Sequence, residues 1–156
     1  MNTFKFLFLF AVTLLSINRV FSQSDENNAE GPTGEVIALT QKEFLQKIYD
    51  YEKNKDAFVY EGDLPCIIDF YADWCAPCKI VEPILKELAE EYKGKIMIYK
   101  INTDNERSLA KAFGIQSIPT YFFVTNKGEL QYAMGALPRE TFVRVIDEVL
   151  LPPINE

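Results

Sequence analysis

The 156-residue sequence contains no histidine. This absence excludes a Ser-His or Cys-His nucleophile pair, and it excludes every zinc site that depends on imidazole ligands. Cysteine is also scarce, because Cys66, Cys75 and Cys78 are the three cysteines of the chain. Three cysteines are too few for a scaffold held together by disulfides. The question is therefore what a small number of thiols does.

Clustered positive charge is missing as well. The chain has 16 basic and 23 acidic residues, a formal net charge of −7, and no patch of Lys and Arg stands out. This balance argues against nucleic acid as a partner. Apolar residues make up 48% of the chain and charged residues 25%, which is typical of one globular domain with a core of its own.

A hydrophobic run long enough to span a membrane is absent too. Lys5 precedes a short apolar stretch, residues 6–15, and Val20 and Ser22 stand at the −3 and −1 positions before Gln23. This pattern predicts a secretory signal peptide over residues 1–22, with an uncleaved membrane anchor as the alternative. We therefore expect export, no stable membrane insertion after cleavage, and a compartment in which disulfides form.

Polar residues 23–34 follow without periodicity, which indicates a flexible leader before a domain over residues 35–152. Within this domain, hydrophobic periodicity predicts an alternation of strands and helices. The expected strands are residues 36–39, 66–71, 96–101, 120–125 and 129–134, with a possible extra strand at 58–60. The expected helices are residues 40–51, 76–93, 104–113 and 138–150.

Local signals support these assignments. Thr40 and Glu43 form a capping-box pattern, Asp104 is a candidate cap, Pro83 is expected to kink the second helix, and Gly94 is expected to end it. The α/β alternation implies a mainly parallel sheet with helices on both faces, closed by an antiparallel hairpin.

Cys75 and Cys78 form a C-x-x-C pair between an apolar strand and an amphipathic helix. A zinc site lacks ligands, because there is one such pair and no histidine. A structural staple over so short a loop removes little entropy from the unfolded chain. A redox couple fits the position, because unpaired N–H groups at a helix N-terminus stabilise a thiolate. We expect Cys75 to be the exposed, attacking sulfur and Cys78 to be the buried, resolving one.

The segment Trp74-Cys75-Ala76-Pro77-Cys78-Lys79 resembles the signature of the thioredoxin family, with Ala76 where the family usually has glycine. The resemblance runs from about Val36 to Leu150. It implies the thioredoxin fold, a central mixed β-sheet flanked by helices on both faces. Further positions match the family in the right order, namely Asp69, Pro83, Lys100, the Ile118-Pro119-Thr120 segment as a cis-proline loop, and Gly135.

The resemblance and the residues together suggest roles for these positions. Asp69 is an aspartate in an apolar strand, where a carboxylate needs a task or a partner. We expect it to relay the proton of Cys78, with Lys100 as its ionic neighbour; a purely structural Asp69–Lys100 pair is the alternative. The expected substrate-binding residues are Trp74, Ala76, Pro77, Ile118, Pro119 and Gly135.

The remaining expectations concern where single side chains lie. Trp74 is more consistent with the rim of the site than with the core, whereas Tyr71 and Met134 are expected to pack. Cys66 is read as a small buried apolar residue, with a regulatory thiol as the alternative.

These features predict a thiol-disulfide oxidoreductase that reduces protein disulfides in an exported compartment, the periplasm of a Gram-negative bacterium. No cofactor and no metal are expected. The expected partners are disulfide-bonded proteins and a membrane electron donor, and the chain is expected to be a monomer.

Three alternatives stay open. The pair could act as an oxidase or isomerase, since the residues between the cysteines tune its potential. The domain could hold unfolded chains as a chaperone-like module, or it could serve in cytochrome c maturation.

Overall fold

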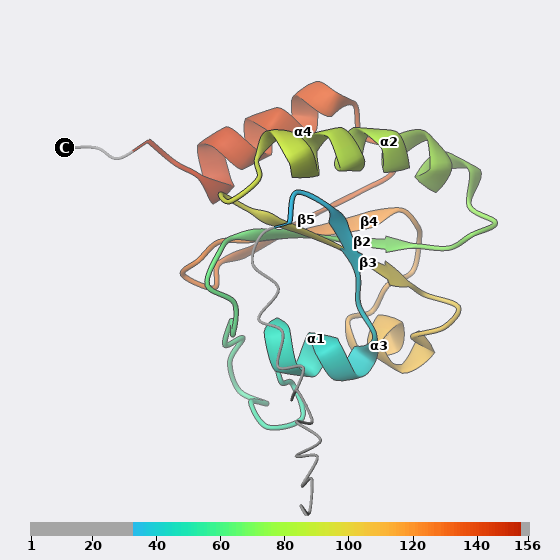
Figure 1. The fold of residues 1–156 in the computed structure, drawn as a ribbon. Helices are drawn as coiled ribbons and strands as arrows, with labels where there is room; N and C mark the ends of the chain where they lie inside the picture. Colours follow the sequence, from blue (N-terminus) through green and yellow to red (C-terminus); the bar gives the residue numbers. More distant parts are fainter. Residues whose placement is uncertain (1–32, 154–156) are drawn as a thin grey trace, which may run out of the picture.

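The computed structural model describes residues 33–153, which form a five-stranded sheet between two layers of helices. Helices α2 and α4 cover one face of the sheet, and α1 and α3 cover the other (Figure 1). The predicted signal peptide and all but the end of the predicted leader lie outside the described residues. In chain order the elements are β1 (Val36–Ala38), α1 (Gln41–Lys47), β2 (Cys66–Tyr71), α2 (Ala76–Glu91), β3 (Met97–Asn102), α3 (Arg107–Ala112), β4 (Thr120–Val124), β5 (Leu130–Met134), α4 (Arg139–Val145) and the short π-helix η1 (Ile146–Leu150).

The sheet is mixed, with the strand order β1-β3-β2-β4-β5. Strand β3 runs parallel to β1 and β2, whereas β4 runs antiparallel to both β2 and β5. The mixed sheet implied by the family resemblance is confirmed. The expected antiparallel hairpin is confirmed as β4–β5, but β4 is also antiparallel to β2, so two of the four strand pairings are parallel and the sheet is less parallel than expected.

The first helix is shorter than predicted and ends at Lys47 instead of near residue 51. Its predicted start is confirmed, since Thr40 and Glu43 form a complete capping box. Beyond its end, the Asp50 carboxylate accepts the backbone N–H groups of Glu52 and Lys53. A side chain that binds nearby backbone groups offers the chain an alternative to the helix, and a turn forms here instead.

The predicted extra strand at 58–60 is absent from the described residues, which place this segment in a loop. Side chains hold the loop in place of a strand ladder. The Phe58 ring lies 4.6 Å from the Tyr49 ring, centroid to centroid, and the Tyr60 hydroxyl donates to the Leu64 carbonyl. Aromatic residues raised the predicted strand tendency of this segment, but their rings pack against α1 and its neighbours.

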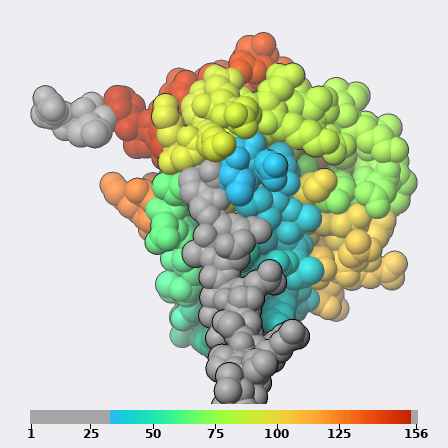
Figure 2. All heavy atoms as spheres, viewed as in Figure 1, coloured from blue at the N-terminus to red at the C-terminus, as the bar shows by residue number. Residues whose placement is uncertain are grey.

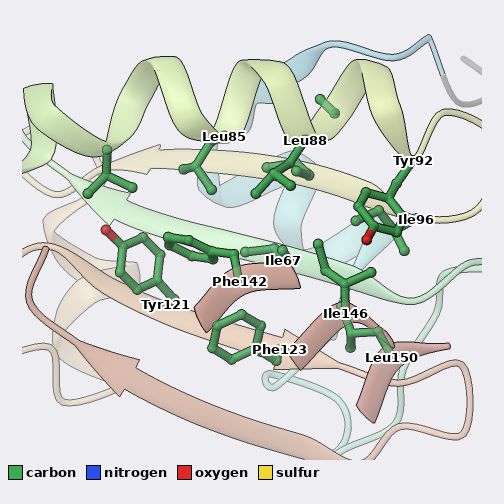
Figure 3. Packing of buried hydrophobic residues seen from close by; sticks show 13 residues of the cluster. Ile67, Leu85, Leu88, Tyr92, Ile96, Tyr121, Phe123, Phe142, Ile146 and Leu150 are labelled. Atoms are coloured by element: carbon green, nitrogen blue, oxygen red, sulfur yellow. The ribbon is translucent and has the colours of Figure 1, made fainter. Parts of the chain in front are cut away.

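Two apolar layers fill the space on either side of the sheet. The layer beneath α2 and α4 contains alternate residues of the central strands, such as Ile67, Tyr121 and Phe123, packed against Leu85 and Phe142 (Figure 3). The intervening strand residues face α1 and α3. This alternation follows from the pleat of a strand, in which successive side chains point to opposite faces.

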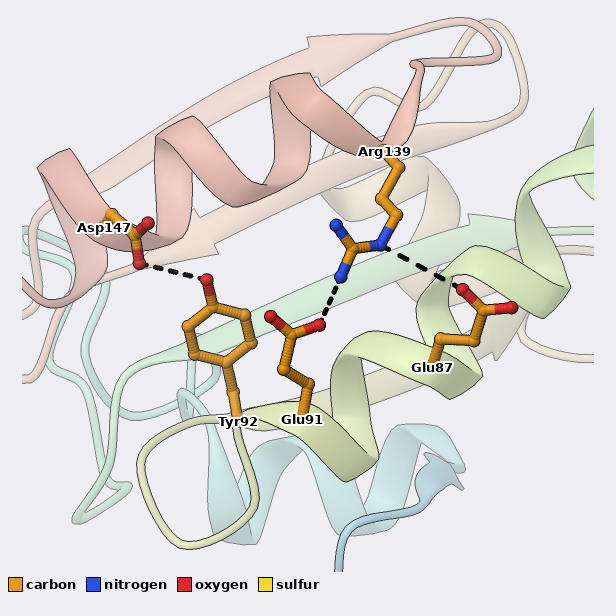
Figure 4. Close-up of polar contacts among 5 residues, drawn as sticks. All are labelled: Glu87, Glu91, Tyr92, Arg139 and Asp147. Carbon is orange, nitrogen blue, oxygen red and sulfur yellow. Dashed lines mark hydrogen bonds and ion pairs between the residues drawn. The ribbon is translucent and has the colours of Figure 1, made fainter.

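Polar contacts join α2 to the C-terminal helical segment at the edge of the first layer (Figure 4). Arg139 of α4 binds Glu91 and lies 4.0 Å from Glu87, both on α2. The Tyr92 hydroxyl donates to the Asp147 carboxylate over 3.0 Å. Such exposed ion pairs each add about 0–1 kcal/mol, so the apolar contacts supply most of the stabilisation here.

The start of the described chain packs beneath the C-terminal part of α2, as the adjoining blue and yellow surfaces in Figure 2 show. A Cβ atom on Gly34 would lie 2.7 Å from the Glu90 carboxylate and 3.0 Å from the Lys93 side chain. The backbone of Gly34 also has a positive φ of 78°. The two flexible side chains could move aside, so it is the positive φ that favours glycine where the chain enters β1.

Candidate functional site

The two motif cysteines form a disulfide at the N-terminus of α2. The sulfur atoms of Cys75 and Cys78 are 2.07 Å apart. Cys75 is the N-cap residue, and its Sγ accepts the backbone N–H of Cys78 over 3.2 Å. That N–H is one of the unpaired donors of a helix start, so the same contact can stabilise a thiolate on Cys75 after reduction. The predicted pairing and its helical setting are both confirmed.

Both sulfur-bearing residues are buried in this disulfide form. Cys75 is 3% exposed and Cys78 is 5% exposed. The expectation that Cys75 would be exposed is therefore wrong for the oxidised protein. Ala72 packs against the pair, and the partly buried Tyr71 and Ile118 complete a small apolar cluster around it. The cluster combines residues from β2 and from the segment before β4, which no local pattern reveals.

Trp74 stands on the rim of the site, as predicted, with 70% of its surface exposed. Its indole Nε1–H donates to the Asp104 carboxylate over 2.8 Å. The Asp104 backbone N–H donates to the Asn102 side chain, whose amide donates to Asp73. The prediction that Asp104 caps α3 is wrong, since the N-cap is Glu106 and makes no side-chain capping bond. Asp104 instead fixes the indole beside Cys75.

The Ile118–Pro119 peptide bond is cis, as the family resemblance implied. The carbonyl of Pro119 accepts the backbone N–H of Gly135 over 2.9 Å, which joins the two predicted substrate-binding segments. Gly135 has a positive φ of 88° and open space around its Cβ position. Ile118 and Pro119 thus lie between the disulfide and Gly135, and their role in substrate binding stays a prediction.

Asp69 lies behind the disulfide in the centre of β2 and is 6% exposed. Burial raises the pKa of its carboxyl to about 7, and the positive charge of Lys100 opposes this rise. Asp69 and Cys78 line the same cavity of about 230 Å³. This volume has room for several waters, and the proton relay from Cys78 to Asp69 stays a prediction. The other lining residues are Tyr71, Ala72, Asp73, Lys79, Glu82 and Lys100.

Lys100 is the register partner of Asp69 on β3, and its positive charge acts on Asp69, but the two make no ion pair in the described structure. Its ammonium lies 4.0 Å from the Glu82 carboxylate and 5.3 Å from the centre of the Tyr71 ring. The alternative of an Asp69–Lys100 structural pair is therefore wrong. A long lysine side chain keeps its charge near solvent, and Glu82 offers a partner there. No pattern in the sequence singles out Glu82 as this partner, because the contact joins α2 to β3.

Cys66 lies apart from the site in the layer beneath α1 and α3, and it is free and fully buried. Burial raises the pKa of its thiol to about 12, so it is unreactive in the folded protein. Within residues 33–153, no three His, Cys, Asp or Glu side chains are arranged to hold a metal ion. No helix in that part of the chain has the length and apolarity to cross a membrane.

Comparison with known proteins agrees with this geometry. The thioredoxin family model matches residues 35–148. A thioredoxin of Borreliella burgdorferi is 39% identical over 113 residues, which cover 72% of this chain and 96% of that protein. An M-type chloroplastic thioredoxin of Spinacia oleracea is 43% identical over 117 residues, 74% of this chain and 65% of that protein.

A solved structure shows the same fold. A mutant thioredoxin from Halobacterium salinarum matches 80% of this chain and 96% of its own, with a TM-score of 0.61 and 24% identity. The family model and the two relatives extend the likeness from the fold to the sequence of the whole described domain. The chain belongs to the thioredoxin family of thiol-disulfide oxidoreductases.

Proposed function

We propose that the protein reduces disulfides of other proteins in an exported compartment, the periplasm of a Gram-negative bacterium. The observation that carries the reductase role is the Cys75–Cys78 pair at the start of α2, with a helix N–H on Cys75 and a cavity that connects Cys78 to Asp69. These features stabilise the attacking thiolate and supply a base for the resolving thiol. Substrates are disulfide-bonded proteins, and no cofactor takes part.

The reaction proceeds in two exchange steps. The Cys75 thiolate attacks one substrate sulfur, so that a mixed disulfide forms and the other substrate sulfur leaves as a thiolate. Asp69 then accepts the proton of Cys78, and the Cys78 thiolate attacks Cys75. The first substrate sulfur leaves as a thiolate, and both substrate thiolates take protons from solvent. Two electrons have passed to the substrate, and the Cys75–Cys78 disulfide is closed.

Recognition of the substrate falls to the surface around the disulfide. Trp74 supplies an exposed aromatic face held by Asp104, and Ala76 and Pro77 are exposed next to it. Across the pair, Pro119 is buried and its carbonyl is bound to the Gly135 N–H, so the partly exposed Ile118 is the residue whose backbone can meet an extended chain. Backbone pairing with an extended segment depends little on its sequence, which suits a reductant of many proteins.

Export rests on the sequence of residues 1–22, with its basic start, apolar core and small residue before Gln23. We expect the mature protein in a periplasmic fraction to begin at Gln23, as measured by intact mass and N-terminal sequencing. A cytoplasmic protein that retains residues 1–22 would overturn the location and leave the reductase chemistry untouched. In the exported compartment, a membrane electron donor has to reduce the Cys75–Cys78 disulfide after each turnover.

The direction of electron flow is tested by the equilibrium reduction potential of Cys75–Cys78, measured on residues 23–156 in glutathione and dithiothreitol buffers. We expect a value near or below about −230 mV, within the range of thioredoxins and glutaredoxins. A value near or above about −180 mV would show that the protein donates or shuffles disulfides, and would overturn the reductase role. Cys66→Ala is the matched control, because it removes a thiol outside the pair and should leave the potential unchanged.

A further inference from the structure

Tyr121 and Asp69 are direct partners on neighbouring strands. They pair in the antiparallel register of β4 and β2. Directly opposed residues of such a pair have Cβ atoms about 4.5–5.5 Å apart and point to the same face of the sheet. Tyr121 packs on the face of the sheet beneath α2. The Tyr121 hydroxyl points towards the N-terminal half of α2 (Figure 3). The site cysteines lie at that end of the helix.

The hydroxyl of Tyr121 and the Oδ1 atom of Asp69 are both buried without a hydrogen-bond partner in the described structure. Tyr121 is 0% exposed. A buried hydroxyl without a partner costs free energy of unfolding, whereas the ring alone would pack as well. The ring lies edge-on to Phe142, with centroids 4.9 Å apart, a contact that phenylalanine would make equally well. Core packing therefore does not explain the hydroxyl.

The charge of Asp69 also affects the pKa of the Tyr121 phenol. Burial, and after it the negative charge of Asp69, raises the pKa of the Tyr121 phenol well above its usual value. The phenol therefore keeps its proton at every pH at which the protein works, and it can only donate to a neighbouring carboxylate. The neighbouring carboxylate is that of Asp69, which can accept this hydrogen bond when it is ionised.

We propose that Tyr121 is a positioning residue for Asp69, whose hydroxyl donates a hydrogen bond to the ionised carboxylate at Oδ1, directly or through one water. The proposal rests on the role of Asp69 as the base of the resolving step. In that step the Cys78 S–H bond breaks, an O–H bond forms on Asp69, and the electron pair stays on Cys78 Sγ. Tyr121 keeps its own proton throughout. It holds the buried Oδ1 atom, while Asp69 and Cys78 line one cavity.

Other charged and titratable groups also surround Asp69. Lys100 reaches it from β3 and Glu82 from α2, with opposite effects on its proton affinity. Cys78 and Lys79 of α2 and the loop residue Asp73 line the same cavity. All of them are unchanged by a substitution at Tyr121, which removes one oxygen atom and no charge. A change in Asp69 titration in such a variant is therefore due to the hydroxyl.

The test is Tyr121→Phe in the mature chain, with Tyr132→Phe as the matched control, because Tyr132 is an exposed tyrosine on β5. The primary readout is the titration of the Asp69 carboxyl carbon by NMR in the folded protein. We expect Tyr121→Phe to raise the Asp69 pKa by roughly 0.5–1 unit, because a donor to the charged form is lost. Tyr132→Phe should leave it unchanged.

A second readout is the pH profile of the resolving step, followed as release of a reduced substrate from the mixed disulfide. Its midpoint should move upward with the Asp69 pKa, and Tyr121→Phe should have no effect in an Asp69→Asn background. An unchanged Asp69 titration in Tyr121→Phe would overturn the proposal and leave Tyr121 a packing residue. The two proposals can fail separately. If the wild-type protein does not reduce a disulfide protein such as insulin, the proposed reductase function fails. The Asp69 titration needs no turnover, so it tests the role of Tyr121 in either case.

Discussion

Cys78→Ser is expected to convert the protein from a catalyst into a trap that stays covalently joined to its substrate. Cys75 can still attack, because the helix N–H on its sulfur remains, but no second thiol is present to resolve the mixed disulfide. Turnover with insulin should fall by at least about 10³-fold, since the two cysteines act as a unit. The adduct should appear as a mass increase that dithiothreitol removes.

Two further variants complete this experiment. Cys75→Ser should lose both turnover and the adduct, because Cys75 is the N-cap whose sulfur accepts the helix N–H that stabilises the attacking thiolate, whereas Cys78 lies within the first turn of α2. Cys66→Ala should keep full turnover, because Cys66 lies in the other apolar layer. Turnover by Cys78→Ser above a tenth of the wild-type rate would show that resolution does not depend on Cys78.

Asp69→Asn is expected to stabilise the protein at alkaline pH and to have little effect at acidic pH. Burial raises the Asp69 pKa from 3.8 to about 7 in the folded protein. Between these values the folded state binds more protons than the unfolded state, so the free energy of unfolding falls as pH rises. The loss is complete above the folded pKa, and it amounts to about 4 kcal/mol at 1.36 kcal/mol per unit.

The measurement is the free energy of unfolding of wild-type protein and Asp69→Asn from urea titrations between pH 4 and 9. The difference between the two should be near zero at the acidic end and should grow to about 4 kcal/mol above pH 8. Asp63→Asn is the matched control, because Asp63 is an exposed carboxylate in the loop before β2. A constant difference across the range would mean that Asp69 does not titrate within it.

The local parts of the site could be predicted from the sequence. The spacing of Cys75 and Cys78 places both sulfurs on one helical turn, and the apolar run before them indicates a buried strand. An aspartate in that run could be identified as unusual because a buried carboxylate needs a reason. Each of these inferences depends on residues that are close in sequence, and the structure agrees with each of them.

Contacts between distant segments could not be predicted in the same way. The burial of Cys75 depends on Ile118, and the ion pair of Lys100 depends on how Glu82 turns towards the cavity. Asp104 satisfied the composition rule for a helix cap, but it bonds to the Trp74 indole instead. The antiparallel direction of β4 likewise follows from how the whole chain closes, since local periodicity does not distinguish strand directions.

The hydrogen bond between Trp74 and Asp104 has an optical consequence. Trp74 is the single tryptophan of the chain, so all indole fluorescence of the protein comes from one side chain next to Cys75. Because that ring is held at the rim and is open to solvent, its emission senses whether the neighbouring sulfurs are joined and whether another chain covers them. The protein thus carries its own reporter of redox state and occupancy at the place where both change.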